Sequence, residues 1–519
     1  MENFPENENL NGQEEFSTVF SDPTEHTTKS FKNSNKRRIL AVLSAFCALA
    51  VLVGGTFAAV KLIPKKSDET TGQPELKEIE VLSQKDTDLK SVTVNNKNGS
   101  FKFYSVITKA EDENSEDTVN WYLDGYKQEL VSTSSISTIV NSITNISASR
   151  EITEKTAEEC GLVNPVISAD VVANDGGKWS VQIGGKSPDN SGVYLKLSTK
   201  DTIYLIPDAI DESLTFEPLD LANTDSIAAL SLDSNYSDYT EDGKLKSFDS
   251  ITVSGKNFPK NVIIEPNNNK IAEMMPYVIT EPVERVAENA DKLLSLFADG
   301  LTVSGAYSFD VTPKTLSDLG LNNPDFTAKI KVKDFTYTYK FKLQSDGNYA
   351  VVTDDSIMVK KVSADSQEVL GYSETDFYAN WVFIESIDKI ANLTVNSGGK
   401  SYSFDIKANP DEDSEEDYIV DYEGKSIKSS DFQAFYEYCI SLKCSDFATE
   451  SLTVPDEASL IYSYNDGSKP VTVTFKKATA TKHQYYVNGK PMGKVNSSEF
   501  NKLDKYLQKL VNGQTVTYN

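Results

Sequence analysis

Histidine and cysteine are nearly absent from this chain of 519 residues. Only His26 and His483 occur, so no histidine pair can hold zinc, and each is expected at the surface. A serine hydrolase would have to use His483, but the chain has no Gly-x-Ser-x-Gly turn for the nucleophile. The four cysteines are too few for a disulfide framework and are interpreted as buried thiols. We therefore expect no catalytic residues, no metal site, no cofactor and no enzymatic activity. The alternative is a hydrolase that uses a pair of the 78 acidic residues for glycoside cleavage, and the sequence favours no particular pair.

Phosphate-binding loops are also missing. Gly-Lys-Ser occurs at 185–187, 399–401 and 424–426, and is interpreted as a hairpin turn each time, because the glycine that a phosphate loop needs five positions upstream is absent. The acidic run 411–417 lacks the central glycine of a calcium-binding loop. A solvated loop is the favoured interpretation of this run, and loose divalent binding is the alternative.

Basic residues are far fewer than acidic residues in this chain. Lysine and arginine total 51 against 78 acidic residues, which gives a formal net charge of −27. A surface of this sign repels phosphate backbones, so nucleic acid is excluded as an expected partner.

One long apolar segment stands out in an otherwise polar N-terminal region. Residues 39–60 are 22 residues without a charge, enough at about 1.5 Å per residue to cross a hydrocarbon layer of about 30 Å. We predict a single transmembrane helix at 39–62, after a disordered cytoplasmic tail at 1–38 and before a linker at 63–77. A cleaved signal peptide is the alternative; either way, the C-terminal bulk is expected outside the cytoplasm.

The remaining residues alternate between two hydrophobic periods. Runs with period two predict β-strands in meanders, and apolar stripes with helical spacing predict one amphipathic helix per unit. The first stripe comprises Ile136, Ile139, Val140, Ile143 and Ile146; the others lie at 293–301 and 432–442. We predict an α+β fold of three tandem repeats, each a β-meander with one helix, at 78–249, 250–390 and, in degenerate form, 391–519.

A short motif occurs in two of these repeats. Gly161, Leu162 and Pro165 in the first copy correspond to Gly320, Leu321 and Pro324 in the second. Each copy follows the apolar helical stretch of its repeat. There glycine supplies a left-handed C-cap, leucine packs back on the helix and proline prevents the helix from resuming. We interpret the motif as structural, in preference to a ligand contact.

At these residues the chain resembles a bacterial family known as domain of unknown function 4340. The similar features are the strand and turn from Trp121 to Gly125, the turn at 161–165, the strand 202–206, and Glu374 to Phe377 before Trp381. The resemblance covers roughly residues 78–450. It implies an exported, membrane-anchored protein without an established activity, associated with ABC-type transporters.

The expected function is therefore a scaffold or interaction module outside the cytoplasm. Its expected partner is a membrane or envelope protein, with ABC-type transporter subunits suggested by the family resemblance, because repeat arrays offer extended surfaces. The alternative is an envelope carbohydrate-binding module that uses the rings of Trp121 and Trp179. Strand-borne tryptophan next to alternating apolar residues is, however, more often part of a core.

Overall fold

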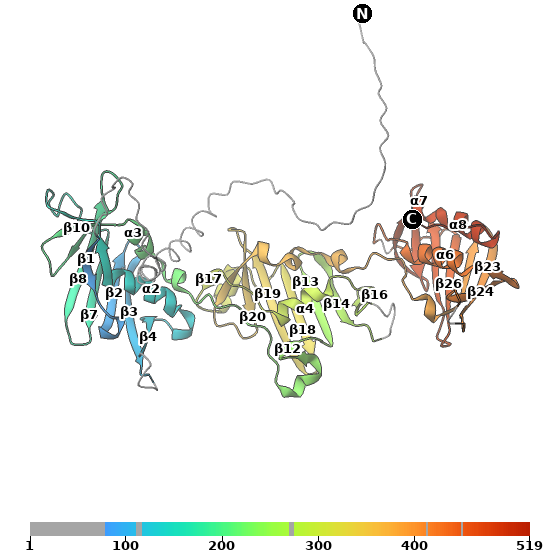
Figure 1. Cartoon of the computed structure of the whole chain (residues 1–519), viewed down its shortest axis with the longest axis horizontal. Coiled ribbons are helices and arrows are strands. Elements are labelled where there is room, and N and C mark those ends of the chain that lie inside the picture. The colour runs from blue at the N-terminus through green and yellow to red at the C-terminus, as the bar shows by residue number, and fades with distance from the viewer. Residues whose placement is uncertain (1–77, 111–116, 269–274, 412–413, 448–449, 519) are drawn as a thin grey trace, which may run out of the picture.

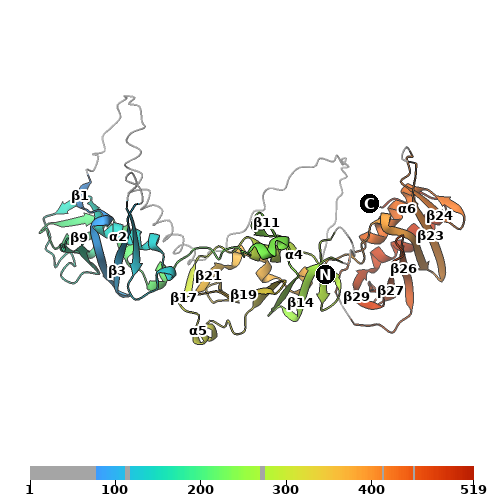
Figure 2. The same ribbon diagram turned by 90° about the horizontal axis from the view of Figure 1, so that it is seen from below.

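The computed structural model describes residues 78–110, 117–268, 275–411, 414–447 and 450–518. Three large β-sheets of eight, nine and eight strands follow one another along the long axis of the molecule (Figure 1). The view from below shows the same row (Figure 2). We call them the first, second and third sheets, in chain order. The predicted tail at 1–38, transmembrane helix at 39–62 and linker at 63–77 lie outside the described residues.

The first sheet is antiparallel throughout. In spatial order its strands are β4 (Thr118–Leu123), β3 (Gly99–Thr108), β2 (Leu89–Asn96), β7 (Ile167–Ala173), β8 (Lys178–Lys186), β9 (Val193–Leu197), β10 (Ile203–Ile206) and β6 (Arg150–Ile152). A separate pair is formed by β1 (Ile79–Ser83) and β5 (Asn145–Ala148).

The second sheet is also antiparallel. Its order is β16 (Arg285–Val286), β15 (Tyr277–Glu281), β14 (Phe258–Pro266), β13 (Ser250–Gly255), β18 (Phe326–Val332), β19 (Phe335–Leu343), β20 (Asn348–Thr353), β21 (Val359–Ser363) and β17 (Gly305–Ser308). A small pair, β11 (Thr240–Glu241) and β12 (Lys244–Leu245), precedes it in the chain.

The third sheet has the order β25 (Lys425–Ile427), β24 (Tyr418–Tyr422), β23 (Lys400–Ala408), β22 (Ile390–Ser397), β26 (Asp456–Tyr464), β27 (Val471–Lys477), β28 (Lys482–Val487) and β29 (Lys490–Asn496). One order of seven strands therefore occurs in all three sheets. In each, the strand β2, β13 or β22 lies between its hairpin partner (β3, β14 or β23) and a strand from beyond the main helix in the chain (β7, β18 or β26). Side chains alternate between faces, as on β23, where Tyr402, Phe404 and Ile406 are buried and their neighbours exposed.

One amphipathic helix accompanies each sheet: α2 (Thr133–Thr144), α4 (Ala290–Ala298) and α6 (Ser429–Ser441). Their apolar stripes join the cores of the sheets. The side chain of Ser132 begins α2 by accepting a hydrogen bond of 3.2 Å from the amide of Ser135. In the third unit α8 (Lys502–Val511) lies beside α6, with the rings of Tyr438 and Tyr506 5.0 Å apart.

Shorter helices occupy the connections. The α-helical ones are α3 (Ala209–Leu214), α5 (Pro313–Asp318) and α7 (Ser497–Phe500). The 3₁₀ turns are η1 (Asp86–Asp88), η2 (Gln128–Leu130), η3 (Pro218–Leu221), η4 (Ser234–Tyr239), η5 (Ala364–Ser366), η6 (Glu368–Gly371), η7 (Glu374–Phe377) and η8 (Ile387–Lys389).

The predicted α+β fold class is wrong. Strands take up 43% of the structure and helices 21%, so the class is mainly antiparallel β. The helical stripes are real but short, whereas each sheet gains strands that the sequence pattern did not separate. Within the described ranges, no helix is both long enough and apolar enough to cross a membrane.

Candidate functional site

The two glycine-leucine motifs form matching corners. Gly161 and Gly320 both have φ = +71°, the left-handed region that favours glycine. In each corner the leucine amide donates a 2.8 Å hydrogen bond to the carbonyl five residues earlier, from Leu162 to Ala157 and from Leu321 to Leu316. This is the bond of a Schellman cap, in which a left-handed residue ends a helical turn.

The capped turns are not the amphipathic helices that the sequence suggested. α2 ends at Thr144 and α4 at Ala298, well before the motifs. In the second copy the capped element is α5, and in the first it is a single turn ending at Cys160. The sequence correctly predicted that each glycine forms a left-handed C-cap, but it assigned the cap to the wrong helix.

Each leucine packs on two strands of its sheet, and the two pairs of strands occupy equivalent positions in the first and second sheets. Leu162 packs with Tyr194 of β9 and Leu205 of β10, and Leu321 packs with Val352 of β20 and Val359 of β21. Pro165 and Pro324 are half-buried after two exposed residues each. These clusters are separate from the main cores, so the motif residues serve packing.

The first corner also touches β8. The amide of Gly185 donates a 3.0 Å hydrogen bond to the carbonyl of Cys160, and a Cβ atom on Gly184 would lie 2.1 Å from that oxygen. Gly185 and Lys186 therefore belong to a strand and its contact with the corner, not to a hairpin turn as predicted. The two later Gly-Lys-Ser motifs do lie at hairpins, between β22 and β23 and between β24 and β25.

Trp121 and Trp179, the two rings that a sugar-binding function would use, lie in and against the first core. Trp121 is fully buried in the first core, and burial raises the pKa of the neighbouring Asp86 carboxyl. Trp179 is half-buried and packs against the same core. A sugar needs an exposed ring face to stack upon, which Trp121 lacks. Trp121 is a core residue.

His483 lies in the interior, contrary to the surface position expected from the sequence. Its side chain is fully buried, with Nδ1 2.9 Å from Ser497 Oγ and Nε2 3.0 Å from Glu457 Oε2. These are the three residue types of a hydrolase triad. Here, however, Ser497 is buried while the Glu457 side chain is 47% exposed, so solvent reaches the acid and not the would-be nucleophile. The group anchors α7 to β28.

The described part of the chain shows no cluster of metal-ligating side chains. Cys160, Cys439 and Cys444 are buried free thiols, and burial raises the pKa of the Cys160 and Cys439 thiols. A high thiol pKa keeps cysteine protonated and poorly nucleophilic. Cys160 and Cys439 are therefore poor candidates for a catalytic nucleophile.

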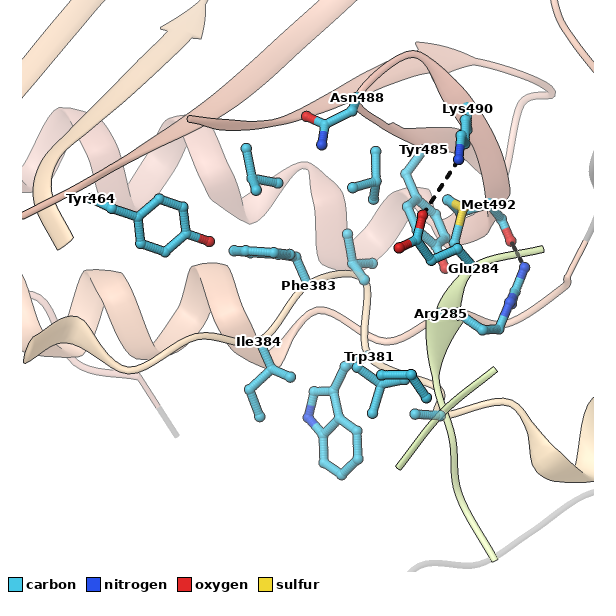
Figure 3. Close-up of a pocket in the computed structure, with 16 residues that line it drawn as sticks. Glu284, Arg285, Trp381, Phe383, Ile384, Tyr464, Tyr485, Asn488, Lys490 and Met492 are labelled. Carbon is cyan, nitrogen blue, oxygen red and sulfur yellow. Dashed lines mark hydrogen bonds and ion pairs between the residues drawn. The ribbon is translucent and has the colours of Figure 1, made fainter. Parts of the chain in front are cut away.

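A pocket lies where the second and third sheets meet (Figure 3). Its volume is about 200 Å³, and its wall comes from β15, β16, the segment 379–384 and the β26 to β29 strands. The wall is mostly apolar: Val278, Val286, Ala379, Val382, Phe383, Ile384, Val471, Val487 and Met492. Trp381 closes one side, and Lys443 Nζ lies 3.5 Å from the centroid of its ring.

Arg285 stands at one end of this pocket. It is only 8% exposed, its guanidinium lies 4.0 Å from the Tyr378 ring centroid and 5.1 Å from that of Phe447, and its Nη2 donates a 3.1 Å hydrogen bond to the Met492 carbonyl. Nε is buried without a hydrogen-bond partner. Among the described residues no carboxylate forms an ion pair with it. The nearby Glu284 is instead paired with Lys490 at 3.4 Å.

Residues 121–235 match the family model described as Domain of unknown function (DUF4340). This match supports the resemblance to that family over this part of the chain. The DUF4340 match runs from Trp121 at the end of β4 to Asn235 in η4, so it includes α2, the first corner and the strands β7 to β10. It is narrower than the resemblance inferred from the motifs. No curated protein and no solved structure matches the chain.

Sequence reasoning missed Arg285 and the pocket. One signal was available: of the 51 basic residues only four are arginine, at positions 37, 38, 150 and 285. Arginine differs from lysine in its planar guanidinium, so the few arginines of a lysine-rich chain are the positions to inspect first, although the exposed Arg150 shares this signal. The contact partners, Tyr378, Phe447 and Met492, come from distant segments and could not be read from the pattern.

Proposed function

We propose that this protein is a non-enzymatic interaction scaffold that works outside the cytoplasm and binds a membrane or envelope protein. The observation that carries the proposal is the row of three sheets with one shared strand order (Figure 1). A row of like-built units offers a long surface made of rigid elements, which is the property that repeat proteins use for binding. The family resemblance makes ABC-type transporter subunits the first partners to test.

The chemistry of the described residues supports binding over turnover. The three described thiols are buried. In the group of Ser497, His483 and Glu457, the serine is buried and the acid is exposed, so the group offers no accessible nucleophile. The net charge of −27 favours a partner with a basic surface, because opposite charges steer association and like charges suppress it.

The first corner is the place where we expect the partner to touch. Val163 and Val166, beside Pro165, are 63% and 56% exposed, more than any other large hydrophobic residue in the described chain. The second corner has Asn322 and Asp325 at the same positions. Exposed apolar side chains on a rigid turn suit the centre of a protein interface.

The test is crosslinking in intact cells. A photoreactive phenylalanine analogue is placed at Val163 or Val166 and, as a matched control, at Asn322 or Asp325, and adducts are identified by mass spectrometry. We expect one envelope or membrane protein to be enriched at the first corner and not at the second. Val163→Asp should then reduce that adduct at position 166 at least tenfold. Adducts of equal yield and composition at both corners, or none, would overturn the proposal.

A further inference from the structure

The pocket between the second and third sheets combines an apolar wall with one buried cation. Tyr464 lies at one end, and Arg285 and Met492 lie at the other (Figure 3). The valines, Phe383 and Ile384 lie along the wall. Pockets that bind small molecules have this character, a mostly apolar lining with a few polar groups that fix orientation.

The guanidinium of Arg285 is incompletely satisfied. Arginine is rarely this buried without a carboxylate, since removing a charge from water is costly unless an opposite charge replaces the solvent. The rings of Tyr378 and Phe447 offset part of that cost through cation–π contacts. One hydrogen bond, to Met492, is made of the five that a guanidinium can donate.

The carboxylates around this end of the pocket have other partners. Glu374 accepts a hydrogen bond from the hydroxyl of Tyr378, whose ring lies against Arg285. Glu284 is held by Lys490, and the exposed fractions of these two side chains, 50% and 64%, place their pair at the solvent rim. Lys443 lies over the Trp381 ring and has Glu288 near it, so it does not add to the charge at Arg285. The end of the pocket at Arg285 therefore favours an anion, and the wall favours an apolar group attached to it.

We propose that this pocket binds a small apolar monocarboxylate, with Arg285 as the residue that binds the carboxylate. The planar fork of arginine matches a carboxylate, and the volume of about 200 Å³ admits a single ring or a short chain. A dianion such as phosphate fits less well, because Glu284 lies at the rim and nothing in the apolar wall solvates a second charge. The site is separate from the partner surface at the first corner, so either proposal can fail alone.

The test is calorimetric titration of the full chain with phenylacetate and hexanoate. Phenylacetamide and hexanamide serve as neutral probes of the same shape, and inorganic phosphate and glucose as further controls. We expect the carboxylates to bind at one site, at least tenfold more tightly than the amides, with no measurable binding of phosphate or glucose.

Three variants locate the site. Arg285→Gln should weaken carboxylate binding at least tenfold, whereas Arg150→Gln, at the exposed arginine of the first unit, should leave it unchanged. Because Arg285→Gln also removes the contact with Met492, a second variant keeps the charge: Val487→Phe fills the pocket from its half-buried wall and should abolish binding. Absence of carboxylate binding, equal binding of amides, stronger binding of phosphate or glucose, or binding that survives Val487→Phe would each overturn the proposal.

Discussion

At the scale of single residues, three side chains depart from what their type suggests. Trp121 is a core residue and does not offer its ring to a sugar. His483 lies in the interior and not at the surface, and Arg285 is buried although it is charged. In each case neighbours from other segments decide the role. The Phe500 ring centroid lies 4.1 Å from that of His483, and Met492 receives the hydrogen bond of Arg285.

His483 makes the third unit sensitive to pH. Burial, the larger effect, lowers the pKa of His483 below its ordinary value of 6.5, although Glu457 opposes this. The unfolded chain then binds a proton at a higher pH than the folded one, so the stability contribution of the neutral ring is lost as pH falls below about 6.5. We expect the stability advantage of the natural chain over His483→Gln to shrink between pH 7.5 and pH 5.5.

The measurement is the melting temperature of both proteins in the same series of buffers. The comparison with the variant cancels the carboxylates that do not touch position 483, because they titrate alike in both chains. An advantage that stays constant, or grows as pH falls, would show that the pKa is not lowered in the folded state.

At the scale of elements, the glycine-leucine corner is the unit that the sequence repeats. Its left-handed glycine, its 2.8 Å hydrogen bond and its buried leucine are the same in both copies. The contacts of the two glycines differ. A Cβ atom at Gly161 would meet the backbone amide of Gly185 at 3.1 Å, whereas at Gly320 it would meet the flexible side chain of Lys342.

We therefore expect Gly161→Ala to lower the free energy of unfolding of the first unit. Left-handed backbone strain alone costs about 1–2 kcal/mol for a residue with a Cβ atom, and the contact with Gly185 adds to it. Gly125→Ala is the matched control, because Gly125 has φ = +86° and no atom near its missing side chain. Urea unfolding followed by tryptophan fluorescence compares them; equal losses would mean that the close approach to β8 is unimportant.

At the scale of the whole molecule, two junctions hold the row together. The second is the Arg285 region, and the first is a small cluster of Leu130, Ala222, Ala306 and Met358. Next to it the rings of Tyr126 and Phe309 meet edge to face at 4.9 Å. With so few buried residues, the first junction should be the weaker constraint on how the units move.

Met358→Ala should loosen the first junction while both flanking sheets remain folded. Met358 is 1% exposed, and a buried methionine replaced by alanine typically costs about 2–5 kcal/mol. The adjacent Ile357 is 49% exposed, so Ile357→Ala should change stability by no more than about 0.5 kcal/mol. Limited proteolysis should show faster cleavage within 223–233 for Met358→Ala alone. Equal cleavage of the two variants would contradict the role assigned to this cluster.

The sequence by itself determined the local structure. The stripe Ile136, Ile139, Val140 and Ile143 is buried on α2, because a helix brings residues three and four apart onto one face. The left-handed glycines of the two corners followed as well, since few other residues tolerate that backbone.

Only the tertiary structure decided the fold class, the position of His483 and the pocket at Arg285. Strand order, sheet size and the meeting of β16 with β29 depend on contacts between segments up to about two hundred residues apart, such as Arg285 with Met492. Hydrophobic periodicity reports which face of an element is buried, but not which element covers it. A site assembled at a junction therefore leaves little trace in the chain beyond the rarity of one residue type.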